Sequence, residues 1–262
     1  MIKKTGWLWC LAAYLIIIWL FLLLAQPNYL TSIILVLGAP TILIWWSLPQ
    51  TRWRILLLAS ASLLLFAPPV ELMARLANAW DVASVLPRLW GTAPLENLLF
   101  AWFNFLLGLS LYEKLTAGDQ PGRLSRRFYY LLALYAIFFA SVLIFYKINP
   151  AIITMDYYRV GILLVLIPLA IFIWCWPSLI KQAAATTLIL ALIFFIYEII
   201  ALRLGYWWWP GNYLWPITIG GKTFPLDDIV FWYLLSTPTL IGGYEFFVKG
   251  RLLQLSCKQT LK

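Results

Sequence analysis

Long apolar runs alternate with short polar connectors along the whole chain. Each run reaches about the 20 residues that a helix needs to cross about 30 Å of hydrocarbon. Eight runs are predicted to span a membrane, at about 7–25, 29–47, 54–73, 95–112, 128–148, 157–175, 181–203 and 228–248. Helix breakers such as Gln26-Pro27 and Asn149-Pro150 lie between them. The pattern lacks the alternating segments of a barrel and predicts an all-α integral membrane protein.

The eight runs fall into two halves whose landmarks match. The spacing from Tyr29 to Pro40 equals that from Tyr157 to Pro168, and Glu71 to Trp80 equals Glu198 to Trp207; Pro94-Leu95-Glu96 corresponds to Pro225-Leu226-Asp227, and Tyr112-Glu113 to Tyr244-Glu245. We predict two four-helix repeats, 1–122 and 123–262. Because each has an even number of spans, the two repeats point the same way, related by an axis along the membrane normal.

The composition agrees with a membrane protein, since 64% of the residues are hydrophobic and 11% are charged. The net charge of +9 forms no single patch that would bind nucleic acid, because the basic residues recur in short clusters between the runs. Thirteen of the lysines and arginines lie in segments on the same side of the membrane as the N-terminus, and six lie on the other side. This excess favours a cell-membrane protein with both termini in the cytoplasm. Lys3 and Lys4 precede the first run as in a signal peptide. However, no small-residue cleavage site precedes Gln26-Pro27, so we expect a retained span.

Cysteine and histidine usage narrows the chemistry. Cys10, Cys175 and Cys257 are isolated, so neither a disulfide framework nor a metal site is indicated. The chain has no histidine, which removes the usual general base. Any catalysis would therefore fall to carboxyl groups, and we expect no cofactor.

Six of the ten acidic residues form three repeat-related pairs: Glu71 with Glu198, Glu96 with Asp227, and Glu113 with Glu245. Glu71 lies near the outer end of the third run and Glu96 near the start of the fourth, which returns from the same side. Glu198, Asp227 and Asp228 repeat that arrangement. Ionisable groups at hydrocarbon depth are costly and are usually functional. We therefore predict a site built from Glu71, Glu96, Glu198, Asp227 and Asp228.

A structural role is the alternative for two of these acids. Glu96 and Asp227 each follow a proline at a helix start, where a carboxylate can meet free backbone N–H groups. The same explanation suits Glu71 and Glu198 less well, because both lie late in their helices. A protonated carboxylic acid is natural at such a position.

The remaining acids are expected to be structural. Glu113 and Glu245 lie at the cytoplasmic helix ends, where we expect interfacial charge pairs, with Lys114 beside Glu113. Asp81, Asp119 and Asp156 lie in connectors, where solvation is expected.

Aromatic residues surround the predicted acid site. An interfacial belt explains some of them, but four in a row at 206–209 exceed what a belt needs. Indole faces stabilise cations within ~6 Å. We predict that Trp80 and Trp207 face a cation and that Trp208 and Trp232 also contact the substrate.

At these residues the chain resembles the membrane-embedded lycopene cyclase domain of the heterodimeric or fused type from bacteria, archaea and fungi. That family carries P-x-E-E-x-x-F-F-x-x-T-N at a helix start, where this chain has Pro94, Glu96, Asn97, Phe100, Ala101, Phe103 and Asn104, and in the second copy Pro225, Asp227, Asp228 and Phe231. The family's W-D-x-x-x-x-x-x-G corresponds to Tyr197-Glu198 with Gly205, and to Val70-Glu71 with Asn78. Asn97 replaces a glutamate of the family, which leaves substrate and product open.

The resemblance implies cofactor-free cyclisation of a lipophilic isoprenoid or carotenoid in the lipid bilayer. One carboxyl would protonate the end group, a second would remove a proton, and Asn104 would orient a carboxyl or the polyene. A carotenoid hydratase or a membrane terpene cyclase of the same fold are alternatives. A proton-coupled carrier and a non-enzymatic assembly subunit are alternatives from other classes. The sequence leaves the oligomeric state open.

Overall fold

The computed structural model of the protein describes residues 6–117, 119 and 122–250. Within this part, seven helical segments are long and apolar enough to cross a membrane: Gly6–Ala25, Tyr29–Trp46, Arg52–Leu76, Leu95–Thr116, Phe128–Ile148, Tyr157–Cys175 and Leu179–Leu204. They match seven of the eight predicted runs. Residues 226–249 are also continuously helical but are not among the seven. Lys3, Lys4, Arg251, Cys257, Lys258 and Lys262, which entered the predictions, lie outside the described residues.

Four α-helices are uninterrupted: α1 (Gly6–Ala25), α6 (Leu95–Tyr112), α7 (Phe128–Ile148) and α10 (Leu179–Leu204). In four other helical segments, two α-helical pieces flank a π-helical turn. These pairs are α2 (Tyr29–Ile33) with α3 (Ala39–Trp46), α4 (Arg52–Ala61) with α5 (Ala67–Leu76), α8 (Tyr157–Gly161) with α9 (Ile167–Cys175), and α11 (Leu226–Asp228) with α12 (Ser236–Gly243). Each π turn closely precedes a proline, namely Pro40, Pro68, Pro168 or Pro238. Proline lacks an N–H and clashes with the carbonyl four residues earlier, and a widened turn accommodates both defects.

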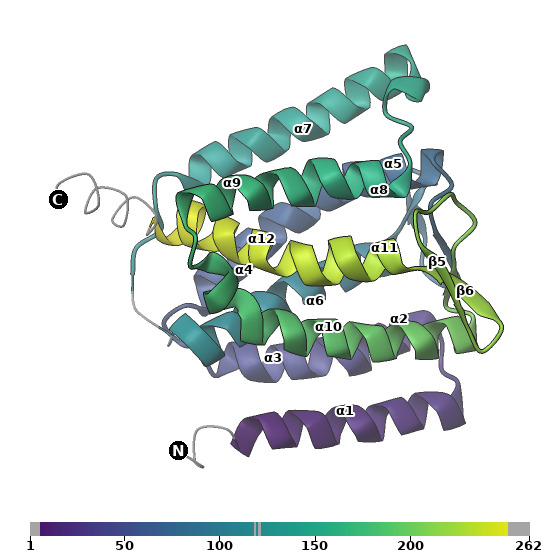
Figure 1. Ribbon diagram of the computed structural model, residues 1–262, viewed down its shortest axis with the longest axis horizontal. Helices are drawn as coiled ribbons and strands as arrows, with labels where there is room; N and C mark the ends of the chain where they lie inside the picture. Colours follow the sequence, from purple (N-terminus) through teal and green to yellow (C-terminus); the bar gives the residue numbers. More distant parts are fainter. Residues whose placement is uncertain (1–5, 118, 120–121, 251–262) are drawn as a thin grey trace.

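Three short antiparallel ladders cover one end of the helix bundle (Figure 1). β2 (Arg88–Leu89) pairs with β3 (Ala93–Pro94), and β5 (Pro216–Ile219) with β6 (Lys222–Pro225). β1 (Asp81–Val82) pairs with β4 (Trp207–Trp208), which joins a connector of the first half to one of the second. The start of α1 and the end of η8 (Tyr244–Lys249) lie at the opposite end of the bundle (Figure 1).

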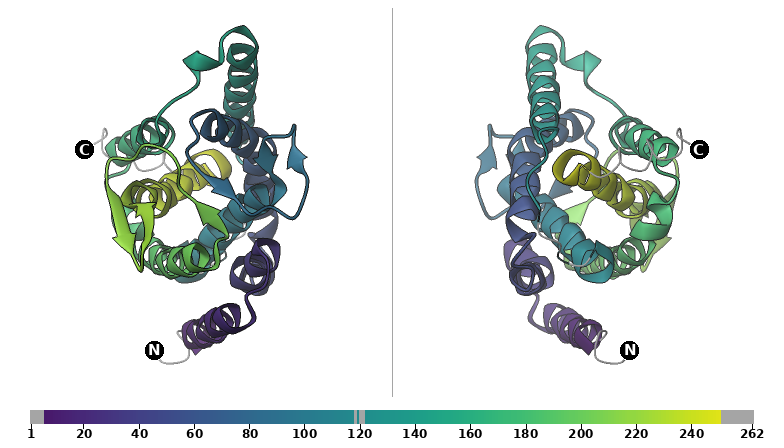
Figure 2. Two further views of the ribbon diagram at one scale, coloured as in Figure 1. Left: turned by 90° about the vertical axis from the view of Figure 1, so that its right-hand side faces the viewer. Right: turned by 90° about the vertical axis from the view of Figure 1, so that its left-hand side faces the viewer.

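The helices differ in how much of their surface the protein covers. Seen along the bundle, α1 and α7 lie at opposite edges, and the C-terminal helical run lies among the others (Figure 2). Accordingly, the protein buries 11% of the apolar stretch of α1 and 17% of that of α7. It buries 56% of the corresponding stretches of the spans that contain α6 and α10. Since exposed surfaces of α1 and α7 are apolar, they are suited to contact with lipid.

A buried charge cluster closes the end of the bundle opposite the ladders. The Lys249 ammonium forms ion pairs with Glu113 and, at 3.0 Å, with Glu245. It also lies 5.7 Å from the Tyr112 ring centroid and 5.0 Å from that of Tyr244. The predicted charge pairing of Glu113 and Glu245 is confirmed, and the pair lies inside the protein at the end of the bundle: the Lys249 side chain is 1% exposed and that of Glu113 is fully buried.

Lys114, which follows Glu113 in the chain, does not join this charge cluster. Lys114 turns away and donates a hydrogen bond to Ser47 at 2.8 Å. Residues adjacent on a helix point about 100° apart, so Lys114 cannot follow Glu113 into the interior. Asp119, which we expected to be solvated, accepts hydrogen bonds from the backbone N–H groups of Gln50 and Thr51.

Candidate functional site

A cavity of about 700 Å³ runs inside the bundle. Tyr157 and Cys175, the first and last residues of one helical segment, both line it. At the rise of a helix these two residues are about 27 Å apart. Apolar side chains form most of its wall, and its volume falls within the range of about 300–1,000 Å³ typical of ligand sites. The cavity is therefore long, narrow and apolar.

Three carboxyl groups lie at the end of this cavity near the ladders: Glu71, Glu198 and Asp228. Glu198, on α10, is 1% exposed. The indole N–H groups of Trp207 and Trp209 both donate to its Oε1 at 2.9 Å. Its Oε2 is buried and has no hydrogen-bond partner among the described residues. The two indoles thus fix one oxygen of Glu198 and leave the other free.

Asp228 lies in the first turn of the C-terminal helical run, which begins at Leu226, and is 5% exposed. It accepts a hydrogen bond from the Tyr157 hydroxyl, on α8. The Glu198 and Asp228 carboxyls are close enough to interact electrostatically. The second half of the chain therefore supplies two neighbouring carboxyls to one cavity.

The first half supplies a parallel arrangement with one carboxyl fewer. Tyr29 donates to the Asn97 side-chain carbonyl at 3.0 Å, and the Asn97 amide donates to Glu71 at 3.4 Å. Trp80 makes a hydrogen bond with Glu71. Tyr29 and Asn97 take the positions that the sequence correspondence gives to Tyr157 and Asp228.

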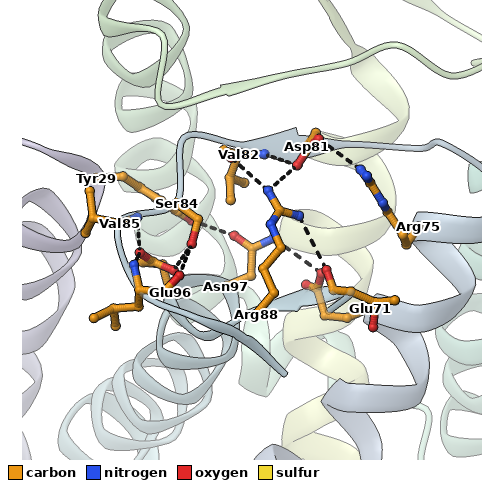
Figure 3. A network of polar contacts seen from close by, with 12 residues as sticks. Tyr29, Glu71, Arg75, Asp81, Val82, Ser84, Val85, Arg88, Glu96 and Asn97 are labelled. Atoms are coloured by element: carbon orange, nitrogen blue, oxygen red, sulfur yellow. Dashed lines mark hydrogen bonds and ion pairs between the residues drawn. The ribbon is translucent and has the colours of Figure 1, made fainter. Parts of the chain in front are cut away.

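Glu96 and Asp227, the other two predicted site acids, are not among the residues that line the cavity. Glu96 accepts hydrogen bonds at 2.6 Å from the Ser84 hydroxyl and from the N–H groups of Val85 and Leu86 (Figure 3). Asp227 accepts from the N–H groups of Leu214 and Trp215. Both carboxylates hold a connector against a helix start, so their role is structural, although the N–H groups they bind belong to the connectors rather than to the helix starts of the alternative. We therefore correct the predicted site by removing Glu96 and Asp227.

Four of the five predicted substrate contacts line the cavity: Trp80, Asn104, Trp207 and Trp232. Trp208 does not, and it is 47% exposed. Residues 207–208 form strand β4, in which alternate side chains face opposite sides. Trp209 lines the cavity instead, together with Tyr157, which sequence reasoning missed as a site residue. The repeated spacing of Tyr29 and Tyr157 was the available signal.

An ion network formed by Asp81, Arg75 and Arg88 lies beside Glu71, the cavity acid of the first half. Asp81 binds Arg88 at 2.7 Å and Arg75 at 2.9 Å, and Figure 3 shows the Arg88 side chain between Asp81 and Glu71. Partial burial raises the pKa of Asp81, but hydrogen bonds from Arg88 and the Val82 N–H outweigh this and hold the pKa below its usual range. The expectation that Asp81 is simply solvated is therefore wrong.

We expect Asp81→Asn to lower the free energy of unfolding by about 1 kcal/mol at neutral pH. The depressed pKa means that the contribution is fully present above the unfolded-state pKa of about 3.9 and is lost as pH falls through the folded-state value. Unfolding in mixed detergent micelles at neutral and acidic pH measures this difference. Asp156→Asn, which removes a more exposed ion pair with Arg159 at 3.3 Å, is the matched control. A deficit that persists unchanged in acid would contradict the assignment.

None of the protein-family models, curated proteins or solved structures compared with the chain matches it. The residues that line the cavity are therefore the ground on which a function can be argued.

Proposed function

We propose that the protein is a cofactor-free membrane enzyme that cyclises the end group of a lycopene-type carotenoid or related isoprenoid. One observation carries the proposal: Glu198 and Asp228 lie together at one end of a long apolar cavity, where indole rings also line the wall. Carboxyl groups in dry surroundings favour the proton-bearing form, and an adjacent carboxyl helps to separate an acid from a base. The sequence resemblance supports the same chemistry.

Glu198 is the proposed acid. A neutral carboxylic acid accepts through its carbonyl oxygen and carries the proton on the other oxygen. The Trp207 and Trp209 donors occupy Oε1, so the proton resides on Oε2, which has no hydrogen-bond partner in the part of the chain that the structure describes. Glu198 transfers this proton to the terminal alkene and forms a tertiary carbocation.

Asp228 is the proposed base. The neighbouring alkene attacks the cation and forms the ring C–C bond, and Asp228 removes a proton from the adjacent carbon to form the ring alkene. One proton enters and one leaves, so no electrons are transferred and no cofactor is required. A proton transfer from Asp228 back to Glu198 resets the pair. Tyr157 stabilises the carboxylate of Asp228 before the reaction.

The ring faces around the acids are the proposed shelter for the cation. Trp80, Trp209 and Trp232 surround Tyr157 with ring centroids 5.5, 5.7 and 6.2 Å from it. Indole faces attract cations, and the apolar wall excludes the water that would trap the cation as an alcohol. Glu71 faces the same space from the first half.

The topology belongs to the same proposal. Residues 226–249 would form an eighth span, and residues 1–122 and 123–262 two parallel repeats. The matching contacts of Tyr29 with Asn97 and of Tyr157 with Asp228 support the duplication. Both termini would lie in the cytoplasm of a cell-membrane protein, with the acids near the outer face.

Expression in lycopene-accumulating cells tests the proposal. We expect a product with the mass of lycopene and a shifted absorption spectrum, since cyclisation removes alkenes from conjugation or constrains them. A product heavier by one water would assign a hydratase instead. Unchanged lycopene in cells that contain the folded protein would argue against both enzymes and favour a carrier or subunit.

A further inference from the structure

The wall of the cavity is thin along one side. Among the residues that line it, those exposed at the protein surface are Leu134, Leu163, Ile171 and Cys175. Leu134 lies on α7, and the other three lie on the helical segment Tyr157–Cys175. All four are within predicted spans and none carries a charge. The exposed part of the cavity wall therefore faces the lipid side of the bundle.

The packing of α7 explains this exposed seam in the cavity wall, which lies between α7 and the helical segment Tyr157–Cys175. α7 packs chiefly on α5 and on the π turn η3 (Ser62–Phe66), and Figure 2 places it at the edge of the bundle, away from α8 and α9. Tyr135 and Phe138 of α7 face the cavity from one side, and Leu164 and Pro168 face it from the other. From Leu163 to Cys175 the seam extends about 18 Å along the helix.

We propose that the cavity is filled from the bilayer through this seam, which we call the α7/α9 opening, by a long hydrocarbon chain that enters with one end leading. The leading end reaches Glu198 and Asp228, and the trailing part leaves through the α7/α9 opening into the lipid. Carbons beyond the opening remain in hydrocarbon before and after binding, so they add little to affinity. The site therefore selects the end group and tolerates different chain lengths. That the chain is an isoprenoid rests on the proposed function; the route does not.

The route is testable without the reaction. The probe is a saturated hydrocarbon with a terminal diazirine, dissolved in phosphatidylcholine vesicles that contain the full chain. After illumination, adducts are mapped by mass spectrometry. We expect adducts on deep cavity residues such as Tyr233, which is 5% exposed.

Blocking the opening should remove those adducts. The double variant Leu134→Trp/Ile171→Trp narrows the opening, and we expect deep labelling to fall roughly tenfold, which corresponds to about 1.4 kcal/mol of lost binding. The matched control is Ile137→Trp/Ile167→Trp, which places the same bulk on the same two helices at exposed positions that do not line the cavity. Thermal unfolding of both variants confirms that each is folded.

Each outcome is decisive for the route. Equal labelling of the deep cavity residues in the blocked and control variants would overturn it. A lack of such labelling in the unaltered chain would overturn it as well. If the labelling pattern holds while lycopene is left unchanged in cells, the route stands and the proposed reaction fails. If lycopene is cyclised while blocking has no effect on labelling, the reaction stands and the route fails.

Discussion

Glu198→Gln is expected to reduce cyclisation by about 10²–10⁴-fold, the range of a general acid. The substitution is nearly isosteric. The glutamine carbonyl can still accept the hydrogen bonds of Trp207 and Trp209, so the side chain keeps its place. What it loses is the proton on the second oxygen. Conversion of lycopene by isolated membranes, normalised to the amount of folded protein, measures the effect.

Two further variants make this result specific. Asp228→Asn should cause a comparable loss, because it removes the proposed base. Glu96→Gln should retain turnover per folded molecule, since its carboxylate binds the connector at 84–86 and does not line the cavity. Wild-type conversion by Glu198→Gln would remove the acid from the mechanism. A loss in Glu96→Gln as deep as that in Glu198→Gln would return Glu96 to the site.

Lys249→Met is expected to have the largest effect on stability, lowering the free energy of unfolding by about 3–5 kcal/mol. The lysine side chain is buried between Glu113 and Glu245, which are 0% and 1% exposed. Removing the cation takes an ion-pair partner away from two buried carboxylates, and the loss of charge pairing in an apolar interior is costly. Unfolding in mixed micelles of a mild detergent and dodecyl sulfate measures the loss.

The chain offers its own control for this substitution. Lys114→Met lies on the same side of the bundle, but its ammonium is exposed and bonds only to Ser47 among the described residues, so we expect a loss within about 0.5 kcal/mol. Adding Glu113→Gln and Glu245→Gln to Lys249→Met should recover part of the stability, because the two buried side chains that lost the lysine are then neutral. Equal losses for Lys249→Met and Lys114→Met would show that the cluster contributes little.

Helix positions were predictable because long apolar runs bounded by prolines and glycines have few alternatives in a membrane. The roles of adjacent acids were not. In Glu96-Asn97 and in Asp227-Asp228 the first residue holds a connector and the second faces the cavity. Neighbours on a helix point about 100° apart, and only the packed bundle decides which of them faces inward.

The error at Trp208 has a different cause. The four aromatics at 206–209 were treated as one group, although residues 207–208 pair as a strand with 81–82. Because side chains alternate along a strand, Trp207 is buried and Trp208 is exposed. Counting four aromatic residues in a row does not show this alternation. The pairing of Glu113 with Lys249 could not be predicted, because it joins helix ends 136 positions apart in the chain.

The carboxyls that face the cavity all lie at one end, and this constrains how a molecule with two identical termini could be handled. In the proposed reaction, the second terminus would be held at a distance from these carboxyls while the first terminus reacts. The compound must dissociate, reverse its direction within the membrane and return before the second terminus can be converted. Each visit is therefore a separate event, and the half-converted compound is a free species in the bilayer between the two.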